Sequence, residues 1–240
     1  MKKIFFTAAI LVFVLCSCKT ELEKPKVSYE ENPKTKKNIV KEDTTEIEIT
    51  DLPIQFSGTN VLLFPVGKIR MLSNTKSLLE KGTDDNINFK ISNYNDNEIS
   101  GFLTNVKFQN IGKDTITALS DKKVLIQSIT YLQEFALKTK KQILVYALED
   151  TDTNKDGTID ANDINTLYLS DIYGKKFTKI TKDFQELIDW KLNIGSNRLY
   201  FRTIEDTNKN GLFDKGDHVK YQFLDLLSTD WKVSEYQPVL

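Results

Sequence analysis

Two stretches of the chain place oxygen-bearing side chains at the same regular spacing. The first runs from Asp152 to Asp163, and the second, from Asp206 to Asp217, matches it at seven of twelve positions. In both stretches Asp or Asn occupies positions 1, 3, 5, 9 and 12, glycine occupies position 6, and an apolar residue occupies position 8. Hard cations bind such oxygen donors, and glycine allows the sharp bend that turns alternate side chains inward. The spacing therefore predicts a cation site in each stretch.

The pattern resembles the twelve-position calcium loop of EF-hand proteins. Position 7 of such a loop supplies its backbone carbonyl, and position 12 is Asp in both copies, as in dockerin-type and other extracellular calcium loops. The expected Ca²⁺ ligands of loop one are Asp152, Asn154, Asp156, Thr158, Asp160 and Asp163. Those of loop two are Asp206, Asn208, Asn210, Leu212, Asp214 and Asp217.

The number of carboxylates predicts which loop has the higher calcium affinity. Loop one carries four carboxylates and loop two carries three, because Asn210 stands at the position of Asp156, so loop one should bind calcium more tightly. Affinities of about 10⁻⁴ to 10⁻³ M suffice outside the cell. Ile159 and Phe213, at position 8, should pin the loops on the core. The alternative is a pair of Asp/Asn/Gly turns that need only local hydrogen bonds and no metal.

The first 18 residues have the pattern of a targeting signal. Lys2 and Lys3 precede an apolar run from Ile4 to Leu15, which is shorter than the ~20 residues of a membrane span and fits a signal peptide. The run ends in Leu-Cys-Ser-Cys, which resembles the lipobox of bacterial lipoproteins. The resemblance implies a signal peptide at residues 1–17, removed by the lipoprotein signal peptidase, and a diacylglycerol thioether and N-acylation at Cys18. An ordinary cleaved signal is the alternative.

The lipoprotein resemblance also implies a location. Lys19 stands where an Asp would resemble an inner-membrane retention signal. We therefore expect a protein of the cell envelope, held by its lipid in the outer membrane and facing the periplasm or the outside. Acyl chains contribute about 0.8 kcal/mol per buried methylene, so two or three of them anchor a domain firmly.

A charged segment should separate the anchor from the domain. Residues 19–52 contain seven Lys, nine Asp or Glu, two Pro and no Gly, which predicts a disordered tether over 18–52 and a domain over 53–240. Ile47 and Ile49 alternate with Glu46 and Glu48 and offer an edge strand as a minor alternative.

The domain should be all-β. Short β-branched and aromatic runs are broken by Gly, Asn and Asp, and only Met71–Lys81 looks helical. The expected strands are 60–66, 104–110, 115–119, 124–131, 142–148, 165–172, 176–181, 186–192, 198–204, 218–226 and 231–236. They group into four-stranded meanders over 124–182 and 183–237, with a degenerate copy over 53–120. The calcium loops recur at this repeat, 54 residues apart.

The run from Leu167 to Phe201 resembles the TolB-type β-propeller repeat. It has a strand, a tight turn, a strand ending in Ile-Thr, an inner strand and a strand reading Asn-Arg-Leu-Tyr-Phe. The resemblance implies a partial or degenerate propeller of about three four-stranded antiparallel units, fewer than the ~4 blades of closed propellers. An open arc or pairing with a second chain would accommodate the shortfall. The alternative is a β-sandwich.

Composition excludes several function classes. Balanced charge, 33 basic against 34 acidic residues, gives no basic face for nucleic acid, and a single His with no Cys beyond Cys18 excludes zinc fingers and Cys-His catalysis. His218 should be a surface residue, and Trp190 and Trp231 should pack in the core. The carboxylate pairs Asp84-Asp85 and Glu149-Asp150 are interpreted as solvated or outer-shell charge.

The sequence therefore favours a binding protein without catalytic residues, whose partner is a protein or an envelope polymer. The runner-up is a surface glycan-binding lipoprotein of an uptake system, which exposed aromatic side chains within 71–102 would favour. A hydrolase ranks third. A pocket with two carboxylates ~5 to 9 Å apart, away from the calcium loops, would favour it.

Overall fold

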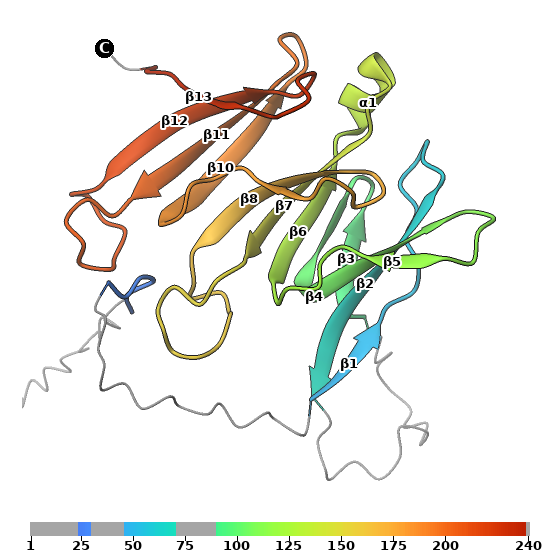
Figure 1. Cartoon of the computed structure of the whole chain (residues 1–240), viewed down its shortest axis with the longest axis horizontal. Helices are drawn as coiled ribbons and strands as arrows, with labels where there is room; N and C mark the ends of the chain where they lie inside the picture. The colour runs from blue at the N-terminus through green and yellow to red at the C-terminus, as the bar shows by residue number, and fades with distance from the viewer. Residues whose placement is uncertain (1–23, 30–45, 71–89, 239–240) are drawn as a thin grey trace, which may run out of the picture.

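The computed structural model describes residues 24–29, 46–70 and 90–238 (Figure 1). Within these ranges the chain forms two antiparallel sheets, neither of which closes, and one short helix, α1 (Gln133–Thr139). The prediction of an all-β fold is confirmed. No helix within these same ranges is long and apolar enough to cross a bilayer. The helix expected at Met71–Lys81 lies outside the described residues.

The larger sheet has nine strands in the order β1-β2-β4-β6-β7-β8-β9, with β3 and β5 also paired to β4. The thirteen residues of β4 are long enough to carry all four partners, β2, β3, β5 and β6. The strands are β1 (Glu46–Thr50), β2 (Val61–Arg70), β3 (Ser92–Asn95), β4 (Glu98–Asn110), β5 (Ile116–Ala118), β6 (Leu125–Tyr131), β7 (Ile143–Glu149), β8 (Asn165–Asp171) and β9 (Thr178–Lys179).

The smaller sheet is a four-stranded meander. It runs in the order β10 (Gln185–Asn193), β11 (Arg198–Glu205), β12 (His218–Asp225) and β13 (Val233–Glu235). Strands β6 to β9 form a second meander in chain order, so both complete units predicted from the sequence are present. The expected third unit, 53–120, is not a separate sheet. Its strand β4 pairs directly with β6 and joins it to the first complete unit.

The two sheets pack together through an apolar core. Val145 of β7 and Leu167 of β8 meet Leu187, Leu199 and their neighbours from the smaller sheet. The alternate residues of β7, among them Tyr146, face a second core on the other side of the larger sheet. Strand β7 is therefore buried on both faces.

Two segments of the expected tether are ordered. Strand β1 pairs with β2 over five residues, so the sheet begins at Glu46 and not near Pro53. Residues 24–29 lie against the domain, with Val27 only 2% exposed. The prediction of a disordered tether across 18–52 is therefore wrong for these two segments. The edge strand that Ile47 and Ile49 offer as the minor alternative is present as β1, whereas residues 24–29 contact Thr153 and Gly211, far along the chain.

Candidate functional site

Loop one and loop two occupy equivalent places in the two meanders. Loop one connects β7 to β8, and loop two connects β11 to β12. Both project from the same end of the molecule, beside residues 24–29 (Figure 1). Because each loop joins the second and third strands of its meander, the repeat in the sequence is also a repeat in space.

The first Asp of each loop organises the turn in the same way. In loop one the Asp152 carboxylate accepts hydrogen bonds from the backbone N–H groups of Asp156, at 3.2 Å, and Gly157, at 2.9 Å. In loop two Asp206 accepts from Asn210 at 3.3 Å and Gly211 at 2.7 Å. The position-1 carboxylate thus holds positions 5 and 6 in both copies.

The last Asp of each loop closes it. Asp163 is fully buried and accepts from the N–H groups of Thr153 (2.7 Å) and Asp160 (2.9 Å). Asp217 accepts from those of Thr207 (2.8 Å) and Asp214 (2.9 Å). Positions 2 and 9 are therefore tied to position 12 in both loops. The backbone hydrogen bonds lower the pKa of Asp217.

The backbone conformations also match. Position 4 is left-handed in both loops, with φ of 60° at Lys155 and 57° at Lys209. Position 6 has φ of 98° at Gly157 and 83° at Gly211, a region that glycine enters at least cost. The two loops therefore share one fold, although only seven of their twelve residues are identical.

The donor set is compatible with calcium but is not preassembled. Positions 3 and 5 of loop one approach each other, with 3.2 Å between Asn154 Nδ2 and Asp156 Oδ2, and Asn210 Nδ2 lies 3.2 Å from Asp214 Oδ2 in loop two. Among the described residues, no three acidic or histidine side chains converge as a metal ligand set. An ion would therefore draw the side chains at positions 1, 3, 5 and 9 inward, while position 7 supplied its carbonyl.

Residues Lys24 to Tyr29, called the strap here, bridge the two loops. The N–H of Lys26 donates to Gly211 O of loop two at 2.8 Å, and the N–H of Ser28 donates to Thr153 O of loop one at 2.8 Å. Thr153 Oγ1 donates in return to Lys26 O at 2.7 Å. Loops 54 residues apart in sequence are therefore joined by a segment that follows the predicted lipid anchor closely.

Side chains reinforce the strap. Val27 is buried, and the Tyr29 ring packs 5.9 Å from that of Phe184. Burial raises the pKa of Tyr29 to about 12, with further contributions from the charge of the neighbouring Asp206 and a hydrogen bond to it. The strap thus lies close to Asp206, a predicted calcium ligand of loop two.

Other sequence predictions have mixed outcomes. His218 is exposed and Trp231 is buried in the core between the sheets, as expected. Trp190 is only partly buried and packs at the edge of that core. Ile159 and Phe213 are half-buried and belong to neither core cluster, so they do not pin the loops as predicted. The strap and the loop hydrogen bonds hold the loops instead.

Glu149 is not the solvated charge expected from the sequence. It is fully buried, and one carboxylate oxygen accepts hydrogen bonds from the side-chain amides of Gln127 and Asn165. Within the described residues its other oxygen, Oε2, has no hydrogen-bond partner. Burial raises the pKa of Glu149 to about 7, despite the lowering effect of these hydrogen bonds. Asp84 and Asp85 lie outside the described residues.

Asp150, the neighbour of Glu149, lies in an ordinary ion pair. Lys179 Nζ is 2.8 Å from its carboxylate, and the Tyr168 hydroxyl donates to the same oxygen at 2.7 Å. Burial alone would raise the pKa of Asp150, but these two partners lower it. Asp150 therefore remains charged and supports the strand end before loop one.

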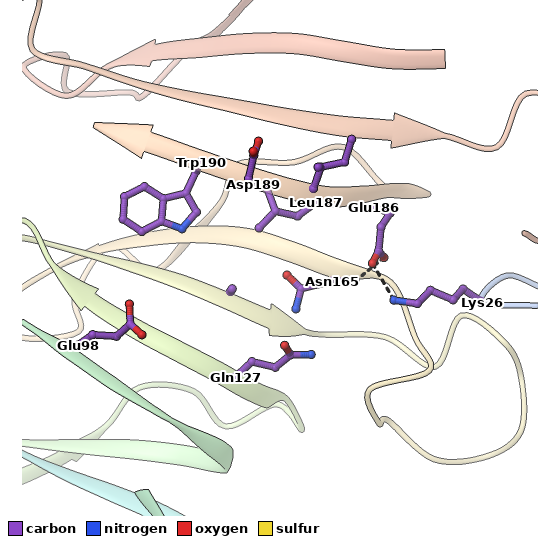
Figure 2. Close-up of a pocket in the computed structure, with 10 residues that line it drawn as sticks. Lys26, Glu98, Gln127, Asn165, Glu186, Leu187, Asp189 and Trp190 are labelled. Atoms are coloured by element: carbon purple, nitrogen blue, oxygen red, sulfur yellow. Dashed lines mark hydrogen bonds and ion pairs between the residues drawn. The ribbon is translucent and has the colours of Figure 1, made fainter. Parts of the chain in front are cut away.

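A cleft of about 500 Å³ opens where the two sheets diverge (Figure 2). Glu186, Asp189 and Trp190 of β10 line one side. The larger sheet contributes Gln127 and Asn165, the amides that hold Glu149, together with Glu98, and the strap contributes Lys26. Sequence reasoning missed this cleft, because its residues come from six separate segments.

No known protein family model matches the sequence. A search of curated proteins also found no match.

Proposed function

We propose that the protein is a lipoprotein of the cell envelope, anchored by its lipid in the outer membrane, whose domain binds a protein or an envelope polymer and is stabilised by calcium. Its two meanders and their TolB-like sequence favour a partial, propeller-like arrangement over a sandwich. Neither nucleic-acid binding nor catalysis is part of the proposal.

The observation that carries the calcium proposal is the equivalence of the two loops. They share hydrogen bonds at positions 1 and 12, left-handed backbone at positions 4 and 6, and oxygen donors throughout. A chance Asp-rich turn has no reason to recur at the same place in a repeated meander. Metal that binds only the folded state adds RT ln(1 + [L]/Kd) to its stability. The mature chain has no cysteine beyond the lipidated Cys18 with which to form a disulfide.

Calorimetric titration of the full chain with CaCl₂ tests the metal sites. We expect two ions per chain, with the tighter site in loop one because it has the extra carboxylate. Asp152→Asn should remove the tighter site, and Asp206→Asn the weaker one. Heats indistinguishable from dilution at millimolar calcium would refute metal binding and leave both loops as turns.

Glycan binding is the second candidate. Aromatic side chains within 71–102 favour it, and Phe102 is 67% exposed while Tyr94 is 48% exposed. Aromatic rings of this kind supply flat apolar surface to a sugar. A glycan array probed with the wild type and Phe102→Ala tests this candidate, and binding that needs Phe102 would promote it.

Hydrolysis stays third. Three carboxylates line the cleft, but Glu186 is paired with Lys26, and Asp189 is paired with Arg202. Among the described lining residues, this leaves Glu98 as the one carboxylate without an ion pair. Two paired carboxylates are poor candidates for an acid and a base, which must exchange protons during a reaction.

A further inference from the structure

We propose that the cleft between the two sheets binds a primary ammonium group, carried by a lysine side chain of a peptide partner. The inference rests on the proposed binding function and names the chemistry of its partner. Its site is separate from the calcium loops, so the two can be tested independently.

The cleft already holds one ammonium group. Lys26 of the strap extends into it, and its Nζ lies 2.7 Å from Glu186 Oε1 (Figure 2). Glu186 Oε2 accepts a second hydrogen bond, from the Asn165 N–H at 2.9 Å, which fixes the carboxylate in place. The chain's own lysine therefore shows how this surface receives a charged amine at one end.

The remaining part of the cleft offers several hydrogen-bond acceptors. The side-chain amides of Gln127 and Asn165 donate inward to Glu149, and this orients their carbonyl oxygens as free acceptors. Glu98 is exposed and accepts only from Thr130 Oγ1, at 3.1 Å, among the described residues. An ammonium ion has three donors and no acceptor, so it matches this lining.

Charge and aromatic surface point to the same ligand. The lining residues carry three carboxylates, of which Lys26 and Arg202 pair with two, so the charge of Glu98 leaves the cleft net negative and unfavourable to an anion. The partly buried Trp190 lies on the same cleft, and its ring face attracts a cation. A neutral sugar would leave the charge of Glu98 unmatched, because Glu98 has no ion-pair partner among the described residues.

Neighbouring features favour a peptide as the carrier. Phe102, four residues after Glu98 on β4, is 67% exposed. Ile188, which lines the cleft, is 43% exposed. A lysine flanked by apolar residues would place its ammonium near Glu98 and its neighbours on these two side chains.

The test uses NMR spectra of the full chain in detergent, with millimolar calcium present. The probe is Nα-acetyl-lysine N-methylamide, and the matched control is the same molecule acetylated at Nε. We expect the indole N–H signal of Trp190, assigned with Trp190→Phe, to shift with a dissociation constant on the order of 1 mM. The Nε-acetylated control should cause no shift.

Two variants make the result specific. Glu98→Gln, at an exposed position, should weaken binding about tenfold, whereas Glu235→Gln, an exposed carboxylate on β13, should leave it unchanged. Lys26→Gln removes the resident ammonium and frees Glu186, so it should strengthen binding about threefold or more. No shift at 50 mM probe (about fifty times the expected constant), or equal binding of the acetylated control, would overturn the proposal.

Glucosamine is a second probe, which tests whether the ammonium group of an amino sugar binds the cleft as well as that of a lysine. Binding equal to that of the lysine probe would overturn the peptide assignment in favour of an amino sugar. A calcium-dependent melting point measured on each sample keeps the two proposals apart. Loss of the lysine response with the calcium effect intact refutes only the cleft, and the reverse refutes only the metal sites.

Discussion

Gly211 offers a direct test of how the strap is held. A Cβ added there would lie 2.4 Å from Val27 O and 2.9 Å from Pro25 Cβ, too close for the strap to keep its position. The φ of 83° adds the ordinary cost of a left-handed alanine, about 1 kcal/mol. Gly112 isolates that cost, because its φ is 82° and no atom lies within 4 Å of its added Cβ.

The expected magnitude follows from what the strap loses. Burial of Val27 contributes about 1.5 to 3 kcal/mol, and each strap hydrogen bond about 0.5 to 1.5 kcal/mol. Ordering the strap backbone opposes these gains by about 1 to 2 kcal/mol per residue. The gains and the ordering cost are therefore of similar size. We expect Gly211→Ala to increase the undocked fraction at least about tenfold, which corresponds to 1.4 kcal/mol.

The undocked fraction can be measured by tryptic cleavage between Lys26 and Val27, followed by mass spectrometry of the intact chain. The bond is shielded when Val27 is buried and both flanking N–H groups bond to Gly211 O. Cleavage that is slow relative to docking follows the open population. Gly211→Ala should be cut about ten times faster than the wild type, and Gly112→Ala at the wild-type rate. Equal rates for the two variants would refute the strap as a docked element.

Three further predictions concern buried and lipidated groups. The pKa of Glu149 is about 7 in the folded state, above its ordinary value of 4.5, so the folded state binds a proton more tightly than the unfolded state does. The stability that this proton contributes is fully present below pH 4.5 and is lost as the pH rises through 7. The difference in unfolding free energy between wild type and Glu149→Gln should therefore change by on the order of 3 kcal/mol between pH 4.5 and 8, and a constant difference in urea titrations would contradict it. Asp163→Ala should lower the unfolding free energy in EDTA by about 1 to 3 kcal/mol, because it leaves the buried N–H of Thr153 without its acceptor. Asp217 is less buried, so Asp217→Ala should lower the unfolding free energy by less. Equal losses in the two variants would contradict this reasoning. Cys18→Ser should move the protein from the detergent phase to the aqueous phase in a phase-partition assay, and retention in the detergent phase would contradict lipidation at Cys18.

The strands were accessible to sequence reasoning because their signal is local. Runs such as Gln142–Leu148 alternate or concentrate β-branched and aromatic residues between turn residues, and β7 was observed at Ile143–Glu149. Strand β3 was missed, since Ser-Asn-Tyr-Asn is typical of a turn and pairs only because β4 lies beside it. Helix α1 was also missed. It is seven residues long and is held by Phe135, which is buried in the core between the sheets.

The strap and the cleft depend on contacts that no local pattern contains. The strap hydrogen bonds to Thr153, 127 residues away along the chain, and its composition is that of a solvated linker. Val27 and Tyr29, two apolar residues in a charged stretch, were the only available signal. Glu149 was misinterpreted for the same reason. It is fully buried, and its hydrogen-bond partners are the amides of two neighbouring strands, β6 and β8.

Calcium stabilisation is the central claim, and thermal unfolding of the full chain tests it most directly. Wild type is melted in EDTA and in millimolar calcium, beside the double variant Asp152→Asn/Asp206→Asn. With about 1 mM calcium and a Kd of about 10⁻⁴ M, each site adds about 1.4 kcal/mol, so the two sites together should raise the wild-type midpoint by several degrees and leave the variant unmoved. An unchanged wild-type midpoint, or an equal rise in the variant, would contradict the account.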